Sequence, residues 1–385
     1  MTAALKTDVR IAVPFDANTI NKIDTYLEMT AKRETLSGNV IVSRGRGTAI
    51  IRSYGCANRE HWVPNTANTR FRIGSVTKQF TAASVLQLQQ RGLLDIQTPI
   101  TKYLPGYPGN EHSSNAITIH HLLTHSSGIP DYLNPELFPD ISEWLRLPST
   151  LEQVIDRFRH LPLVFEPGAA FLYSNSGYVL LTHIIETVAG QSYGDYLQAN
   201  IFLPLGMTNT GYEVPKAVIP NLAQGYFSLG SQSYIQAEPI DMSLPQGAGG
   251  LYSTVEDLAI WSQWLSRFEQ EYDFSKQSPL SEDSVALLLR PIIAMDLDRP
   301  APDAFYGYGL VHDVYLGRQV IHHNGSINGF ASALAHYPTE KLTVGILANC
   351  ENTPADKVMR DLASIVFDKV REPCHETQIA LSDCR

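Results

Sequence analysis

The strand-like segments of this chain lie in two blocks at opposite ends of the sequence, and this separation is the strongest constraint on its fold. Strand-like runs occupy residues 39–43, 48–54, 309–314, 319–322, 330–336 and 343–348. Between the blocks, Pro and Gly are frequent and helical spacing dominates. Because an isolated hairpin is at best marginally stable, we expect both blocks to contribute to one antiparallel sheet.

The predicted fold class is α/β (α+β), an antiparallel sheet flanked by helices, with an inserted mainly helical domain. Residues 1–96 and 300–385 are expected to form the discontinuous sheet domain, and residues 97–299 the helical insertion. A chain of 385 residues is long enough for such a division.

Helices are predicted near both ends and throughout the middle of the chain. The most apolar one is expected over residues 71–94 and should be largely buried, with Gly92 at its end. Further helices are expected at residues 17–34, 119–124, 151–158, 178–188, 193–201, 255–265 and 356–370.

The composition indicates an ordinary globular protein, with 44% hydrophobic residues, 18% charged residues and a net charge of −10. An acidic chain without a basic stripe is a poor match for nucleic acid or an anionic membrane. No apolar run reaches the roughly 18–20 residues of a membrane span. No leader is visible after Met1, which predicts a cytoplasmic protein unless a leader has been removed. No pattern predicts the oligomeric state.

The four cysteines are too sparse for a disulfide scaffold, and none of them forms a Cys-x-x-Cys pair. Cys374 and Cys384 flank a short tail segment. In an oxidising compartment they would be able to form a disulfide, and the sequence leaves this pairing open.

Ser75 and Lys78 form the first candidate catalytic motif. Residues three apart on a helix lie on the same face, which places the Lys78 amine beside the Ser75 hydroxyl. Serine is a weak nucleophile until a base removes its proton, and lysine becomes such a base when burial lowers its pKa towards neutrality. Taken alone, an ordinary helix start with a serine cap explains the motif as well.

Tyr173 and Asn175 form the second motif, between the Pro167-Gly168 turn and a predicted helix. The pKa of tyrosine is about 10, so a phenolate is useful only near positive charge, which Lys78 would supply. The Asn175 amide is suited to orienting a substrate carbonyl or the Lys78 amine. Alone, this motif also fits a loop tyrosine with a polar neighbour.

The third motif is His323-Asn324-Gly325-Ser326, between two strand-like runs. A glycine on a strand lets a substrate backbone approach closely, and main-chain amides there can form half of an oxyanion hole. His323 would orient a carboxylate or donate to the tyrosine, although a single histidine at a strand end is often structural.

Together these motifs resemble the serine β-lactamase/penicillin-binding-protein superfamily, in the class C β-lactamase-like branch that includes D-alanyl carboxypeptidase and esterase relatives. Ser-x-x-Lys, Tyr-x-Asn and His-x-Gly occur in the order and at the spacing of that family, and the likeness covers nearly the whole chain. Similar segments occur at residues 71–78 (FRIGSVTK), 119–130 (IHHLLTHSSGIP), 204–207 (PLGM), 249–254 (GGLYST) and 325–330 (GSINGF). The implied fold is β-lactamase/transpeptidase-like.

The resemblance also implies a role for each site residue. Ser75 would attack a carbonyl and form an acyl-enzyme, with Lys78 and Tyr173 exchanging its proton; which of the two is the general base stays open. Asn175 would position the acyl amide. The backbone amides of Ser75 and Ser326 would stabilise the oxyanion.

The third motif departs from the family pattern, which is usually Lys-Thr-Gly in class C β-lactamases and often His-Thr-Gly in D-alanyl carboxypeptidases. A neutral His323 offers less positive charge than lysine, and Asn324 replaces a hydroxyl that would contact a substrate carboxylate, next to Gly325. Both changes disfavour an efficient β-lactamase or a strict D-alanyl-D-alanine carboxypeptidase. Esterase, amidase, D-amino-acid peptidase and transacylase activities remain open.

The leading hypothesis is a serine hydrolase that acts on a small-molecule or peptide amide or ester and needs no cofactor. The alternatives are a transacylase that uses the same residues and a non-catalytic penicillin-binding sensor. Activity assays with a panel of esters, D-amino-acid amides and β-lactams would separate them.

A metal site is not predicted, although His120, His121 and His125 lie close together in the sequence. Zinc requires three or four ligands, usually with a carboxylate or cysteine among them, and there is no His-Glu-x-x-His motif. The glycine-rich nucleotide-binding motifs and the Gly-x-Ser-x-Gly motif of α/β-hydrolases are also absent from the sequence.

Overall fold

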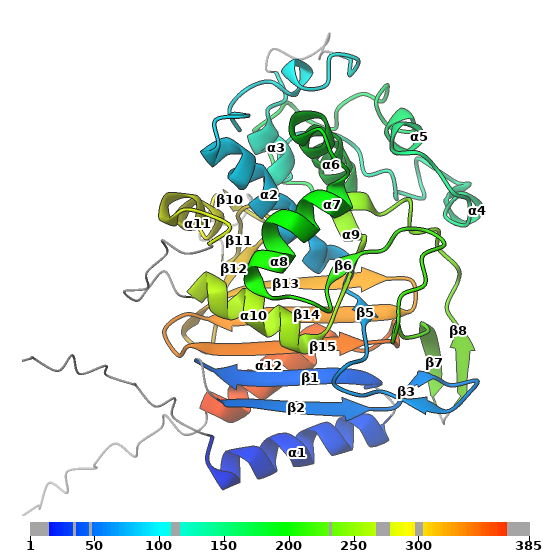
Figure 1. Ribbon diagram of the computed structural model, residues 1–385, viewed down its shortest axis with the longest axis vertical. Helices are drawn as coiled ribbons and strands as arrows, with labels where there is room; N and C mark the ends of the chain where they lie inside the picture. Colours follow the sequence, from blue (N-terminus) through cyan, green and yellow to red (C-terminus); the bar gives the residue numbers. More distant parts are fainter. Residues whose placement is uncertain are drawn as a thin grey trace, which may run out of the picture.

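The computed structural model describes residues 15–33, 36–45, 48–108, 116–230, 233–266, 278–296 and 303–367. Its centre is an eight-stranded antiparallel sheet with helices on both faces (Figure 1). The predicted fold class is therefore confirmed. Cys374 and Cys384 lie outside the described residues.

The sheet joins strands from both ends of the sequence. The junction is the antiparallel pair of β1 (Gly38–Arg44) and β15 (Leu342–Ala348), in which Gly38 lies opposite Ala348. In spatial order the other strands are β10 (Ile293–Ala294), β11 (Phe305–Tyr306), β12 (Val311–Tyr315), β13 (Arg318–Ile327) and β14 (Phe330–Tyr337) before β15, and β2 (Thr48–Tyr54) after β1. All neighbouring strands are antiparallel.

Helices cover both faces of the sheet. Every residue of β14 and β15 is buried, as expected for central strands that are packed on both sides. On one face α12 (Ala355–Phe367) packs against β14 and β15, and α1 (Ala17–Lys32) packs against α12. On the other face α10 (Val255–Leu265) packs against β1 and β15 (Figure 1).

The middle of the chain is mainly helical, as expected. Its helices are α3 (Ile119–Leu123), α4 (Ile141–Trp144), α5 (Leu151–Asp156), α6 (Asn175–Ala189), α7 (Tyr193–Leu197), α8 (Leu203–Leu205), α9 (Gln246–Gly249) and α11 (Glu282–Leu288), with short turns at η2 (Ile100–Lys102) and η3 (Gln198–Phe202). Two elements of the 97–299 segment are associated with the sheet and not with the other helices alone. β10 is an edge strand of the sheet, and α10 packs on its face. The division into two domains stays a prediction.

Several short strands were not predicted from the sequence. They are β3 (Cys56–Asn58), β4 (Val63–Pro64), β5 (Phe71–Arg72), β6 (Gly211–Tyr212), β7 (Tyr226–Gly230), β8 (Ser233–Gln236) and β9 (Leu251–Ser253). Five of them, all except β7 and β8, have only two or three residues, too few to show an alternating pattern. The sheet β5-β9-β6 lies next to the turn that carries Ser75.

The helix predicted over residues 71–94 begins later than expected. Residues 71–72 form β5, which pairs with β9, and Gly74 has a positive φ of 48°, which a continuous right-handed helix does not allow. A 3₁₀ turn, η1 (Gly74–Thr77), then leads into α2 (Lys78–Gln90). The predicted end is confirmed by the left-handed φ of 71° at Gly92, and the residues from Lys78 to Leu88 are buried.

The third motif also differs from the prediction, because residues 323–326 lie within β13 and not between two strands. β14 provides a continuous antiparallel partner, with His323 opposite Leu334 and Ser326 opposite Ala331. Successive side chains of a strand point to opposite faces. His323 and Gly325 therefore lie on one face of β13, and Asn324 and Ser326 on the other.

The chain's own backbone, rather than a substrate, approaches Gly325. A Cβ atom at Gly325 would lie 2.1 Å from the carbonyl oxygen of Ile73 and 2.3 Å from Oγ of Ser332. That carbonyl accepts a hydrogen bond of 2.8 Å from the Ser332 hydroxyl. The glycine thus allows β13 to contact the segment that leads into the Ser75 turn.

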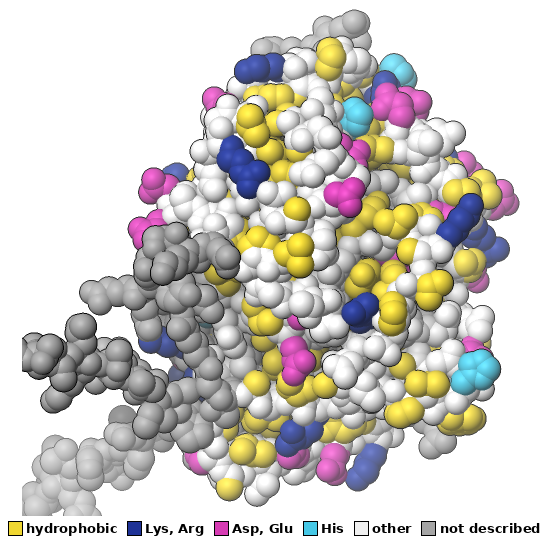
Figure 2. All heavy atoms as spheres, in the orientation of Figure 1, with side chains coloured by type: hydrophobic (Ala, Val, Ile, Leu, Met, Phe, Trp, Pro, Cys, Tyr) yellow, Lys and Arg dark blue, Asp and Glu magenta, His cyan; other side chains and the backbone are white. Residues whose placement is uncertain are grey.

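Within the described ranges, no helix combines the length and the apolar character of a transmembrane span. On the face shown in Figure 2, basic and acidic side chains are interspersed. Neighbouring charges of opposite sign therefore partly neutralise one another on this side of the molecule.

Gly325→Ala is expected to destabilise the protein by about 1–3 kcal/mol, because the new methyl group overlaps the Ile73 carbonyl and backbone has little room to move. Urea unfolding followed by circular dichroism measures the free energy of unfolding. Gly106→Ala is the matched control, since nothing lies within 4 Å of a Cβ there. Equal stabilities of the two variants would show that the close approach does not constrain the fold.

Candidate active site

Ser75 and Lys78 lie where the η1 turn continues into α2. The Lys78 amine, Nζ, is 3.1 Å from the Ser75 hydroxyl oxygen. Ser75 is only half-buried, whereas Lys78 has no exposed surface. Ser75 therefore keeps some exposed surface, while its partner amine is shielded from water.

Three oxygen atoms surround the Lys78 amine. Besides Ser75, Nζ donates to Oδ1 of Asn175 at 2.9 Å and to the carbonyl oxygen of Ala248, in α9, at 2.8 Å. Burial lowers the pKa of Lys78 from 10.5 to about 7, and the carboxylate of Asp131 opposes this shift. Near neutral pH a substantial fraction of the amine is thus unprotonated.

Tyr173 also contacts the Ser75 hydroxyl and lies just before α6 in the chain. Its phenol hydrogen-bonds to Ser75, and the Lys78 Nζ lies 4.8 Å from the centre of its ring. Burial raises the pKa of the Tyr173 phenol above its ordinary value. Tyr173 is therefore a neutral phenol at neutral pH, able to donate or relay a proton.

Asp131 was not predicted from the sequence, yet it holds the Asn175 amide in place. Its Oδ2 accepts from Nδ2 of Asn175 at 2.8 Å and from the Asn175 backbone amide at 3.3 Å. This bond turns Oδ1 of Asn175 towards Lys78. Asp131 directly follows the family-like segment 119–130, which is the one signal that pointed to it.

The third motif reaches the site mainly through His323 and through backbone. His323 is buried, and its ring centre is 6.3 Å from that of Tyr173. A Cβ at Gly74, next to Ser75, would lie 2.9 Å from the Ser326 backbone nitrogen. Gly325 contacts Ile73, as described above.

Asn324 is not part of this group. Its side chain is on the opposite face of β13, where Nδ2 donates to Oδ1 of Asp356 in α12 at 3.2 Å. The alternation of side chains along β13 explains this placement, because only every second residue faces the Ser75 turn. The structure thus brings Ser75, Lys78, Tyr173, Asn175 and His323 together by their side chains, and Gly325 and Ser326 by their backbones.

His125 and Tyr306 also surround the site and were not assigned to it from the sequence. The His125 ring is 4.2 Å from that of Tyr173 and 4.7 Å from that of Tyr306, measured between centres. Tyr306 comes from β11, which lies between the edge strand β10 and β12. Neither residue stands in one of the three motifs, so motif spacing did not reveal them.

The three histidines considered for a metal have separate roles. His121 takes part in the capping box of α3, where its Nδ1 accepts from the Thr118 amide at 3.2 Å. His120 contacts Tyr308, and His125 belongs to the aromatic group around Tyr173. The described residues contain no group of three or more His, Cys, Asp or Glu side chains arranged for a metal ion.

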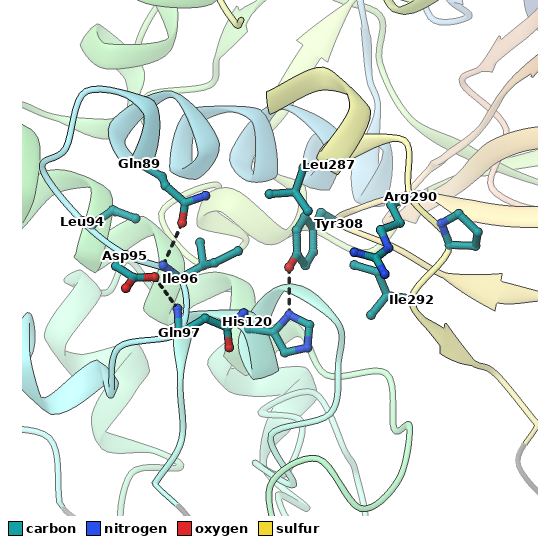
Figure 3. A pocket seen from close by; sticks show the side chains of 11 residues that line it. Gln89, Leu94, Asp95, Ile96, Gln97, His120, Leu287, Arg290, Ile292 and Tyr308 are labelled. Carbon is teal, nitrogen blue, oxygen red and sulfur yellow. Dashed lines mark hydrogen bonds between the residues drawn. The ribbon is translucent and has the colours of Figure 1, made fainter. Parts of the chain in front are cut away.

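A separate cavity of about 680 Å³ lies beside α2, α3 and α11 (Figure 3). The Tyr308 hydroxyl and the His120 Nδ1 in its wall are 2.8 Å apart. Among its other lining residues are Gln89, Ile96, Leu287 and Arg290. None of the predicted site residues lines this cavity, so the Ser75 group lies outside it.

Comparison with known proteins tests the superfamily that the three motifs predict. The family model described as Beta-lactamase matches residues 21–366. The chain belongs to the beta-lactamase family. The superfamily predicted from the three motifs is thereby confirmed.

Two curated relatives show how far the similarity extends. Penicillin-binding protein 4* of Bacillus subtilis (strain 168) is 28% identical over 343 residues, which cover 86% of this chain and 71% of that protein. The D-aminopeptidase of Gluconobacter oxydans (strain 621H) is 28% identical over 313 residues, or 81% of this chain. This chain spans only 55% of the D-aminopeptidase.

A solved structure of a penicillin binding protein from Bacillus halodurans matches with a TM-score of 0.74 at 31% identity. The match covers 89% of this chain and 98% of that one. The similarity thus includes both the sheet and the helical region.

Proposed function

We propose that this protein is a serine hydrolase that cleaves an amide or ester through an acyl-enzyme on Ser75. The observation that carries this proposal is the buried Lys78 amine, which lies 3.1 Å from the hydroxyl of the half-buried Ser75. Its lowered pKa makes it a base near neutral pH.

In the acylation step, Oγ of Ser75 attacks the substrate carbonyl carbon while its proton passes to Nζ of Lys78. The unprotonated amine donates its two hydrogens to Asn175 and Ala248, and its lone pair then faces the Ser75 hydroxyl. Of the two candidate bases, Lys78 fits better than Tyr173, because burial favours the free amine and disfavours the phenolate.

The remaining steps need a proton donor and an oxyanion site. Tyr173 gives its proton to the leaving amine or alcohol as the carbonyl–heteroatom bond breaks, and the Lys78 ammonium returns a proton to Tyr173. Water then attacks the ester carbonyl and transfers a proton to the same pair, the acyl–Oγ bond breaks, and the pair returns that proton to Oγ of Ser75. The amides of Ser75 and Ser326 stabilise the negative oxygen in both halves.

The proposed substrates are esters, amides or peptides of D-amino acids. The D-aminopeptidase relative supports this class. The third motif supports it as well, because it offers a buried His323 where a lysine would supply a fixed charge, and the Asn324 amide points to Asp356. A carboxylate on the substrate therefore gains little at this end of the site.

Ser75→Ala is expected to abolish acyl-enzyme formation and to lower the hydrolysis rate by about 10³-fold or more, because no other group replaces the nucleophile. Intact-protein mass spectrometry after mixing with a p-nitrophenyl ester detects the acyl adduct, and a tryptic digest places it. Ser233→Ala, at an exposed position on β8, controls for loss of any serine. An undiminished rate in Ser75→Ala would refute the proposal, and products that form only when an amine or alcohol acceptor is added would indicate a transacylase.

Asp131→Asn is expected to move the acid limb of the kcat/KM profile to lower pH. In the wild type the rate rises as Lys78 loses its proton, with a midpoint at about pH 7. The Asp131 carboxylate favours the ammonium form, so its removal lowers the Lys78 pKa by up to about one unit. The base form then persists to lower pH.

Glu136→Gln is the matched control for this experiment, since it removes an exposed carboxylate from the same loop. Its profile should coincide with that of the wild type. An acid limb that moves to higher pH in Asp131→Asn would contradict the assignment of Lys78 as the base.

A further inference from the structure

A chain of hydrogen bonds links His125, Tyr306 and His323 beside the catalytic group. The backbone amide of Ser174 donates to Nδ1 of His125 at 3.1 Å. In a neutral imidazole only one nitrogen carries a proton, so the proton of His125 is on Nε2. That nitrogen is 3.2 Å from the Tyr306 hydroxyl and donates to it.

At the other end of this series of hydrogen bonds, His323 carries its proton on the other ring nitrogen, Nδ1. Nδ1 of His323 is 2.6 Å from the carbonyl oxygen of Asn324, which can only accept, so this nitrogen carries the proton. Nε2 of His323 is therefore an acceptor, 3.1 Å from the Tyr306 hydroxyl. The bonds run in one direction, from Ser174 through His125 and Tyr306 to His323.

Tyr178 is the other hydrogen-bonding neighbour of Tyr306. Its own hydroxyl proton goes to the carbonyl oxygen of Leu123 at 2.9 Å, and its oxygen already accepts from the Gly309 amide. The Tyr306 hydroxyl has two candidate acceptors, the Tyr178 oxygen and Nε2 of His323. The Tyr178 oxygen accepts from the Gly309 amide in either case, whereas Nε2 would be a buried acceptor without a donor, so we assign the proton to His323.

The surroundings favour the neutral form of both rings. The groups facing them are the Lys78 amine, the phenols of Tyr173, Tyr178 and Tyr306, and, for His125, the ring of His323. His322 is the neighbour of His323 in sequence and lies on the opposite face of β13, and it also lowers the His323 pKa. Burial is the largest effect and Lys78 adds to it, which lowers the pKa of His323 to about 3 and that of His125 well below its usual range.

We propose that Tyr306 is a positioning residue that sets substrate specificity, because with His125 it holds His323 as a neutral ring whose two nitrogens are both occupied. His323 then has neither a charge nor a free N–H for a substrate carboxylate. This inference rests on the proposed function. It predicts that the enzyme favours acyl donors that are neutral at the end of the site next to β13, such as amino-acid amides and esters.

The tautomers can be read directly from the wild-type protein labelled with ¹⁵N-histidine. Long-range ¹H–¹⁵N spectra distinguish a protonated from an unprotonated ring nitrogen. We expect His125 to carry its proton on Nε2 and His323 on Nδ1, with neither ring titrating between about pH 5 and 8. His125→Asn and His323→Asn assign the signals.

Specificity is measured as the ratio of kcat/KM for two matched donors, D-phenylalanyl-glycinamide and D-phenylalanyl-glycine, which has a carboxylate in place of the terminal amide. Tyr306→Phe removes the donor that occupies Nε2 of His323. A substrate carboxylate at this end of the site can then favour protonation of the ring, so the preference for the amide donor over the carboxylate donor should fall by about ten-fold or more. Tyr308→Phe is the matched control. Its hydroxyl bonds to His120 in the separate cavity (Figure 3), so tautomers and ratio should not change.

Two results would overturn the proposal: a His323 ring protonated on Nε2 at neutral pH, or a donor ratio that Tyr306→Phe leaves unchanged. If no acyl-enzyme formed with any donor, the proposed function would fail instead, and the nitrogen shifts would still decide the positioning role of Tyr306. The two failures are therefore distinguishable.

Discussion

The enclosure of the Lys78 amine by three oxygen atoms is the interaction on which the rest of this site depends. An ammonium without partners at a fully buried position would be strongly destabilising. Here each hydrogen has an acceptor, from Ser75, Asn175 and Ala248. Burial still favours the neutral amine, so the same contacts that make Lys78 tolerable in the core leave it with a lone pair directed at the nucleophile.

The architecture explains why residues so distant in sequence meet around this amine. The strands of the two chain ends pair as β1 and β15, which brings β13 to the turn before α2. Gly74 and Gly325 allow the backbones at that junction to touch, because any side chain there would overlap Ser326 or Ile73. The helical segment supplies the opposite wall with Tyr173, Asn175 and Asp131.

Much of this arrangement was predictable, and the exceptions have physical causes. The Ser75–Lys78 contact follows from helical spacing, although it spans the end of a 3₁₀ turn and the start of α2. Asn324 does not lie beside the substrate as predicted, because the side chains of β13 alternate between its two faces and that of Asn324 points to Asp356. Asp131, His125 and Tyr306 reach the site only through tertiary packing, which a local pattern does not encode.

The most direct test of the account is the pKa of Lys78 itself. Lysine labelled with ¹³C at the ε-carbon gives one signal per side chain, and the signal missing from Lys78→Met identifies Lys78. We predict a titration midpoint at about 7. A midpoint near the ordinary lysine value of about 10.4 would contradict the claim that this amine is the base that activates Ser75.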